Sequence, residues 1–120
     1  PIQDCLLFPQ RLPCPAPQLN LAEALALTMS PPDPARYPCL GLARAAAAAG
    51  GTAPAIFNAA NEVAVEAFVA GAVPFTGIAE LVQQTLASVG ACEPSSLADV
   101  LAADGEARRT ASRLAPGLAH

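Results

Sequence analysis

Lysine and tryptophan are absent from this sequence, and histidine occurs once, at His120. Charged residues make up 13% of the 120 residues, against about 25% in a typical globular domain. The only cations are six arginines, and the net charge at pH 7 is −4. Scattered arginines on an acidic chain are poorly suited to neutralising phosphates, so the composition argues against nucleic-acid binding.

Export and membrane signals are also missing. The amino terminus lacks the basic region and the long apolar stretch of a signal peptide. No run of about 18 uncharged apolar residues is present, so we expect no membrane association. The chain begins with Pro1 rather than Met, and we expect it to be a piece of a larger protein.

Apolar residues are abundant, at 53% of the chain. A small domain has a high ratio of surface to volume and needs charged residues to cover that surface. The shortage of charge therefore suggests that another part of the protein covers some of this surface. The many alanines offer a second explanation, because alanine counts as hydrophobic and yet tolerates exposure.

The cysteines Cys5, Cys14, Cys39 and Cys92 include no CxxC pair, and the single histidine is terminal. This pattern argues against a zinc site. Two disulfides are arithmetically possible, as in a stapled secreted protein. In so apolar a chain, buried reduced thiols are the expected state, and they favour a cytoplasmic location.

Prolines crowd residues 9–34. Because proline fixes φ and lacks an N–H, long helices are excluded there, and residues 9–18 should form an irregular connector. Residues 24–30 place alternate apolar side chains on one face, which predicts a short β-strand. Its sheet would lie elsewhere in the protein or in a second copy. Asn20 could instead cap a short helix.

Helical patterns follow residue 37. Pro38 suits the first position of a helix that ends at Gly50 and Gly51. A second helix is expected over residues 55–69, where apolar side chains follow a period of 3.6. A third should begin after Thr76 as its N-cap and end at Gly90.

Two further starts are predicted towards the carboxyl terminus. Ser96 and Asp99 have the spacing of a capping box for a short fourth element, and Asp104 should cap a final segment that reaches Leu114. Short loops imply antiparallel neighbours. The predicted fold is mainly α: a small antiparallel bundle of about four helices, preceded by an irregular proline-rich segment with one short β-strand.

The least common cluster of polar residues is Asn58, Asn61, Glu62 and Glu66, which would share an arc of about 140° on one helix. A binding surface or part of a metal site is one interpretation. We favour a structural one, in which the stripe bonds to a neighbouring element or faces water.

Other charged residues are likewise interpreted as structural. Asp33 and Arg36 flank Pro34 and should form a local ion pair that anchors the following helix. Arg108, Arg109 and Arg113 could bind an anion, although a solvated cluster that complements the helix dipole is favoured. The sequence contains no nucleophile–base pair and no glycine-rich phosphate loop.

Three segments together resemble one enzyme family. They are residues 32–43 (PDPARYPCLGLA), 57–68 (FNAANEVAVEAF) and 74–79 (PFTGIA). In order and spacing they are similar to the C-terminal region of 1-deoxy-D-xylulose 5-phosphate reductoisomerases, and the resemblance covers essentially the whole chain.

The resemblance implies the chemistry of the whole enzyme. The family rearranges 1-deoxy-D-xylulose 5-phosphate and reduces it with NADPH to 2-C-methyl-D-erythritol 4-phosphate, on a route to isoprenoid precursors. It requires Mg²⁺ or Mn²⁺ and works as a cytoplasmic homodimer. An N-terminal domain holds NADPH, and a central domain supplies the metal ligands, the phosphate-binding residues and a lid.

None of the family's catalytic, cofactor-binding or metal-binding residues maps onto this chain. The resemblance assigns residues 1–35 to the tail of the central catalytic domain and residues 36–120 to a C-terminal helical domain. A structural motif is expected at Asp33, Arg36, Asn58, Asn61 and Glu62. The partners would be the catalytic and NADPH-binding domains, and the chain alone should bind no cofactor and be inactive.

The alternative is an independent, non-catalytic helical interaction module. In either case, the loss of a covering partner predicts exposed apolar side chains along residues 1–35, with self-association as the consequence.

Overall fold

The structure is a computed structural model that describes residues 2–17, 20, 22 and 26–118. It divides into two compact units, Pro1–Pro31 and Pro32–His120. Within the described residues, no helix combines the length and the apolar character needed to cross a membrane.

The first unit contains one short helix, α1 (Ile2–Leu7), which buries no side chain. The Gln3 amide donates hydrogen bonds to the carbonyl oxygens of Leu12 and Pro13, at 3.1 and 3.2 Å. This helix was not predicted. The prolines from Pro9 onward exclude long helices, but a helix of 6 residues fits before them. The expected exposure is present here: Ile2, Leu6, Phe8, Leu12, Leu27 and Met29 are all largely exposed.

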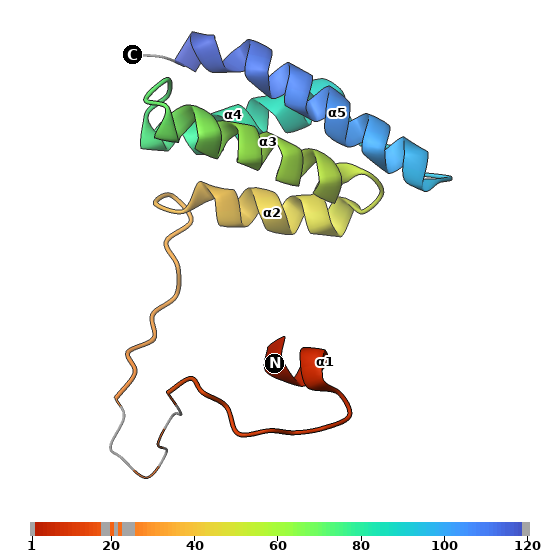
Figure 1. The fold of residues 1–120 in the computed structure, drawn as a ribbon. Helices are drawn as coiled ribbons and strands as arrows, with labels where there is room; N and C mark the ends of the chain where they lie inside the picture. The colour runs from red at the N-terminus through yellow and green to blue at the C-terminus, as the bar shows by residue number, and fades with distance from the viewer. Residues whose placement is uncertain (1, 18–19, 21, 23–25, 119–120) are drawn as a thin grey trace. The chain divides into compact units, whose positions relative to one another are not determined.

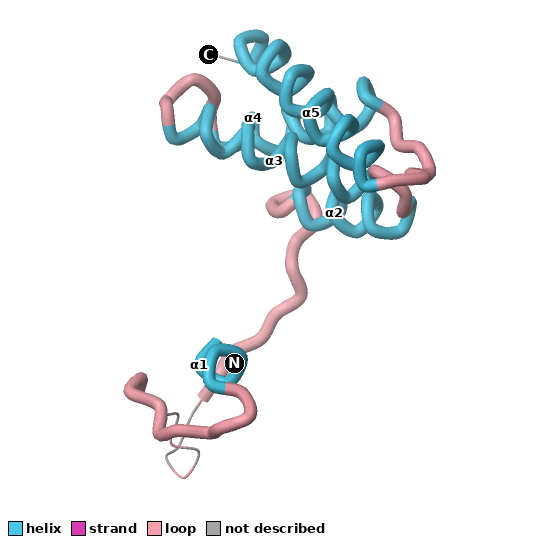
Figure 2. Tube along the Cα trace, turned by 45° about the vertical axis from the view of Figure 1, so that its right-hand side comes forward, coloured by secondary structure: helices cyan, strands magenta, loops and turns pink. Residues whose placement is uncertain are grey.

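The predicted β-strand is not supported. Residues 26–30 adopt no regular structure, and residues 24 and 25 of the prediction lie outside the described part. Figure 2 accordingly draws helices and loops but no strand among the described residues. A strand needs a neighbouring strand to pair with its N–H and C=O groups. The alternating apolar side chains predicted a strand here without identifying such a neighbour.

The second unit is a four-helix bundle, as predicted (Figure 1). Its elements are α2 (Pro38–Ala49), α3 (Ala53–Val69), α4 (Phe75–Val89) and α5 (Leu97–Leu114), followed by the 3₁₀ turn η1 (Ala115–Leu118). Consecutive helices run in opposite directions. Helix α3 packs against each of the other three, whereas α2 contacts α3 and α4.

Local signals set most of the helix ends. Pro38 occupies the first position of α2, where its missing N–H costs nothing. Gly50 and Gly90 follow α2 and α4, each with φ of 68°. The capping box is confirmed: Ser96 Oγ accepts from the Asp99 N–H, and Asp99 Oδ2 accepts from the Ser96 N–H.

Two predicted starts are wrong. Helix α4 begins at Phe75 with Pro74 as its N-cap, so Thr76 is already helical. Helix α5 is continuous, and Asp104 lies in its middle instead of capping a second segment. Asp104 accepts a hydrogen bond from Arg108 one turn later, at 2.8 Å. This i,i+4 pair supports an unbroken helix.

The core is built largely from small side chains. Ala59, Ala60 and Ala64 of α3 are fully buried, as are Leu81 and Val82 of α4. A methyl group fills little space, so neighbouring helices pack close to α3. Along α3 the predicted periodicity holds for the fully buried Ile56, Ala60 and Ala64, whereas Phe68 is 39% exposed.

One end of the bundle is closed by a contact between two loops. The Thr52 N–H donates to the Cys92 carbonyl oxygen at 2.9 Å, and the Cys92 N–H donates to Thr52 Oγ1 at 3.0 Å. Thr52 is 1% exposed. Gly51, with φ of 56°, brings its backbone so close that a β-carbon would lie 2.4 Å from the Cys92 carbonyl oxygen.

The prediction of buried thiols is wrong for three of the four cysteines. Cys5, Cys14 and Cys92 are exposed and Cys39 is half-buried, and all four are free. The exposed ones lie in a short unpacked helix, the connector and a loop, where no core is available to cover them.

Candidate functional site

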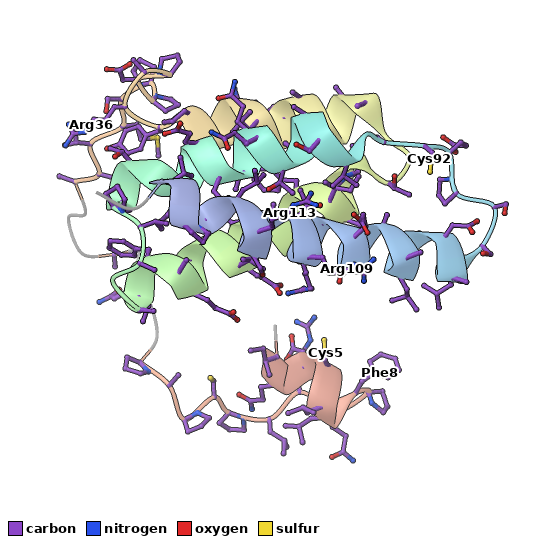
Figure 3. All side chains as sticks on the ribbon, turned by 90° about the horizontal axis from the view of Figure 1, so that it is seen from above. Cys5, Phe8, Arg36, Cys92, Arg109 and Arg113 are labelled. Carbon is purple, nitrogen blue, oxygen red and sulfur yellow. The ribbon has the colours of Figure 1, made fainter. Side chains whose placement is uncertain are left out.

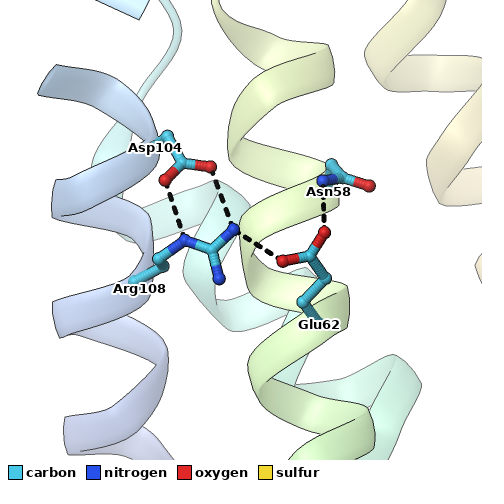
Figure 4. A network of polar contacts seen from close by, with 4 residues as sticks. All are labelled: Asn58, Glu62, Asp104 and Arg108. Atoms are coloured by element: carbon cyan, nitrogen blue, oxygen red, sulfur yellow. Dashed lines mark hydrogen bonds and ion pairs between the residues drawn. The ribbon is translucent and has the colours of Figure 1, made fainter. Parts of the chain in front are cut away.

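Four charged and amide side chains link α3 to α5 (Figure 4). Asn58 Nδ2 donates to Glu62 Oε1 at 2.9 Å, and Arg108 Nη2 donates to Glu62 Oε2 at 2.6 Å. Arg108 also donates from Nε and Nη2 to Asp104, at 2.8 and 3.3 Å. One guanidinium therefore bridges carboxylates on two helices, and Arg108 lies 46 residues from Glu62 in sequence.

The contacts shift the proton affinities of the network. Hydrogen bonds from Arg108, and then from Asn58, lower the pKa of Glu62. Hydrogen bonds to Asp104 and Glu62 raise the pKa of Arg108. Both groups are thus held in their charged forms at neutral pH. Such a network links α3 to α5 but offers no group poised to exchange a proton.

The polar stripe is only partly used. Asn58 and Glu62 belong to the network, whereas Asn61 is half-buried and Glu66 is exposed, and neither joins it. The sequence analysis placed Arg108 in a solvated arginine cluster, whereas it pairs with Glu62 on α3, a partner that no local pattern could identify. Arg109 pairs with Glu106 at 2.7 Å, and Arg113 lies in the last turn of α5.

The expected ion pair between Asp33 and Arg36 does not form. Asp33 Oδ1 instead accepts from the Ala35 N–H at 2.9 Å, and the Asp33 carbonyl oxygen accepts from the Tyr37 N–H at 2.9 Å. The Arg36 guanidinium lies 5.7 Å from the centroid of the Tyr37 ring. The turn before α2 is therefore held by backbone hydrogen bonds and by a cation–π contact.

A groove opens between the first turns of α2 and α4, with a volume of about 520 Å³. Residues 35–40 line one side, and Phe75, Thr76, Ile78 and Ala79 line the other. We call it the α2–α4 groove. Its lining is mostly apolar, and burial raises the pKa of the Cys39 thiol within it. The groove was not predicted from the sequence. Its only signal there is the presence of apolar residues in the first turns of two helices.

Within the described ranges, no group of three or more His, Cys, Asp or Glu side chains is placed to hold a metal ion.

Replacing Glu62 with glutamine should lower the melting temperature at pH 7 by roughly 1–3 °C, because an exposed ion pair contributes little. The pKa of Glu62 is lowered by folding, so its contribution is complete above the ordinary carboxyl pKa. It is lost as the pH falls through the lowered value. The difference between wild type and variant should therefore vanish in acid, as followed by circular dichroism. Glu66→Gln, one turn later and outside the network, is the control and should show no such difference.

Known proteins with similar sequences belong to one enzyme family. Residues 1–110 match the family model described as DXP reductoisomerase C-terminal domain. The 1-deoxy-D-xylulose 5-phosphate reductoisomerase of Afipia carboxidovorans is 48% identical, over 99% of this chain and 30% of the relative. That of Burkholderia multivorans is 48% identical, over 95% of this chain and 29% of the relative.

A solved structure gives the same result. The reductoisomerase from Zymomonas mobilis in complex with NADPH superposes with a TM-score of 0.82 at 40% identity, covering 95% of this chain and 30% of that one. The chain thus spans about 30% of the length of the relatives it matches.

Proposed function

Since this chain belongs to the family of the DXP reductoisomerase C-terminal domain, we propose that it is the structural C-terminal domain of a longer 1-deoxy-D-xylulose 5-phosphate reductoisomerase. The observation that carries the proposal is the match of residues 1–110 to that domain, at 48% identity to a relative more than three times as long. The helical bundle supplies a rigid body of the kind that supports a catalytic domain.

The whole enzyme would convert 1-deoxy-D-xylulose 5-phosphate to 2-C-methyl-D-erythritol 4-phosphate with NADPH and Mg²⁺ or Mn²⁺, as a cytoplasmic homodimer. The NADPH part is supported by the relative from Zymomonas mobilis, which was solved with that cofactor. In this proposal the metal ligands and the other catalytic groups belong to the remainder of the enzyme.

Residues 1–35 would then be the tail of the catalytic domain and its connector, and residues 36–120 the supporting domain. Within this proposal Asn58 and Glu62 join α3 to α5, and Asp33 and Arg36 shape the turn before α2. Asn61, half-buried beside the network, completes the proposed structural motif. None of the five is assigned a catalytic role.

A chimera tests the proposal. The C-terminal region of the Afipia carboxidovorans reductoisomerase that matches this chain would be replaced by the chain itself. NADPH oxidation would then be assayed with substrate and Mg²⁺. We expect activity close to that of the parent, none from the parent truncated at the junction, and none from the chain alone.

A folded chimera without activity would overturn the assignment. It would favour the alternative, an independent helical interaction module, which the exposed apolar side chains of Ile2, Leu6 and Phe8 would also suit. Turnover by the isolated chain would contradict a purely structural role.

A further inference from the structure

The α2–α4 groove has the exposed apolar lining of an interaction surface. Phe75 is 70% exposed, Tyr37 51% and Leu40 39%. Scattered exposed apolar residues are ordinary on a protein surface, but several of them around one hollow mark a place where another surface binds.

The groove also carries unbalanced positive charge. Arg36 lies on its wall, and no described carboxylate pairs with it. Helices α2 and α4 both begin at the groove, and neither has a side-chain cap on its first N–H groups. Both helix dipoles therefore add partial positive charge. A complementary surface would be apolar with at least one carboxylate.

The position of the groove indicates which surface that is. Residues 35–37, which lead from the preceding chain into α2, themselves form part of its wall. Thr52 contacts Cys92 at the opposite end of the bundle, and Figure 3 labels Arg36 and Cys92 at opposite ends. A smaller hollow that reaches this far end, of about 250 Å³, is lined by alanines with Leu42, Ile56 and Leu86 and by no charged residue. In the relatives, about 70% of the enzyme lies outside the matched region, and by the family description that portion precedes it.

We propose that the α2–α4 groove is the docking site for an apolar, acid-bearing surface of the catalytic part of the same polypeptide. This inference rests on the proposed function. The connection through the chain makes docking intramolecular, with the high effective concentration that a tether provides. Binding at this end would fix the angle at which the bundle supports the catalytic part.

Thiol labelling tests the proposal. Cys39 lies in the groove and Cys92 at the far end, so one maleimide reaction reports on both, with peptide mass spectrometry to distinguish them. In the chimera with the Afipia carboxidovorans enzyme, Cys39 should react roughly tenfold more slowly than in the chain alone. The rate at Cys92 should be the same in both.

A pair of matched variants separates docking from folding. Phe75 and Leu97 are the first residues of α4 and α5, exposed by 70% and 73%. In the chimera, Phe75→Glu should restore fast labelling of Cys39 and reduce activity, because it places a like charge against the acidic surface. Leu97→Glu should change neither. Circular dichroism of each variant chain verifies that the bundle is folded.

The outcomes are distinct. An active chimera in which Cys39 reacts as fast as in the chain alone overturns the groove as a docking site and leaves the proposed function intact. An inactive chimera overturns the proposed function and, with it, this inference. A third outcome would assign the groove to a second copy of the chain and overturn the proposal. In that case Cys39 reacts slowly in the chain alone, light scattering shows a dimer, and Phe75→Glu dissociates it.

Discussion

Replacing Gly51 with alanine should destabilise the bundle by ~3 kcal/mol, through left-handed backbone strain and the loss of a backbone hydrogen bond. Gly51 has φ of 56°, and a β-carbon there would lie 2.4 Å from the Cys92 carbonyl oxygen. Backbone atoms cannot swing aside as the end of a side chain can. The two loops must therefore separate, and the hydrogen bonds between Thr52 and Cys92 would be lost with them.

Two other glycines provide matched controls. Gly50 also has positive φ, of 68°, but a β-carbon there meets nothing within 4 Å. Gly50→Ala should cost only the backbone term, about 1–2 kcal/mol. Gly41 lies inside α2 with open space around it, so Gly41→Ala should stabilise by about 0.5–1 kcal/mol. Urea unfolding of all three variants measures the change in free energy of unfolding and so ranks their effects. Equal costs at Gly50 and Gly51 would contradict the close approach to Cys92.

Leu81→Ala should cost ~3 kcal/mol, within the range for a leucine removed from a packed core. Leu81 is 0% exposed and belongs to the same core cluster as Ala60, Ala64 and Ala111. The cluster also contains Val73, Val82 and Leu118, and a packed core relaxes only partly when a side chain is removed. The cavity should therefore persist after substitution.

Leu101→Ala is the corresponding control on α5, where the side chain is 63% exposed. It should change stability by no more than about 0.5 kcal/mol. Thermal and urea unfolding of both variants would be compared at pH 7. A Leu81 variant as stable as the Leu101 variant would show that the core cluster is not packed as described.

The helix boundaries that local chemistry dictates were predictable from the sequence. Pro38 starts α2, Gly50 and Gly90 follow α2 and α4, and Ser96 forms its capping box with Asp99. Each of these effects operates within one turn of the chain, so a window of sequence contains all the atoms involved.

Features that depend on competition between partners were not predictable. Asp104 suits an N-cap by its side chain, but its pairing with Arg108 inside a continuous helix prevailed. Thr76 suits a cap as well, yet Pro74 holds the extended conformation that precedes α4. The thiols of Cys5 and Cys14 would be buried only if a core were packed beside them.

The candidate sites likewise combine features that local sequence predicts with features that depend on helix packing. Periodicity placed Asn58 and Glu62 on one face of a helix, and the structure keeps them together. Their bridge to Arg108 depends on how α3 and α5 pack, which spans 46 residues of sequence. The α2–α4 groove requires two helix starts to lie side by side, and no local pattern encodes that arrangement.

Helix α2 has a consequence for how the bundle opens. It buries Ala46 alone and packs mainly against α3 and α4, whereas α3 lies against all three other helices. Amide hydrogens of α2 should therefore exchange with solvent through partial opening, while those of α3 exchange only on global unfolding. The least firmly held helix is the one that the connector enters. The bundle therefore combines three closely packed helices with one, α2, that we expect to open first.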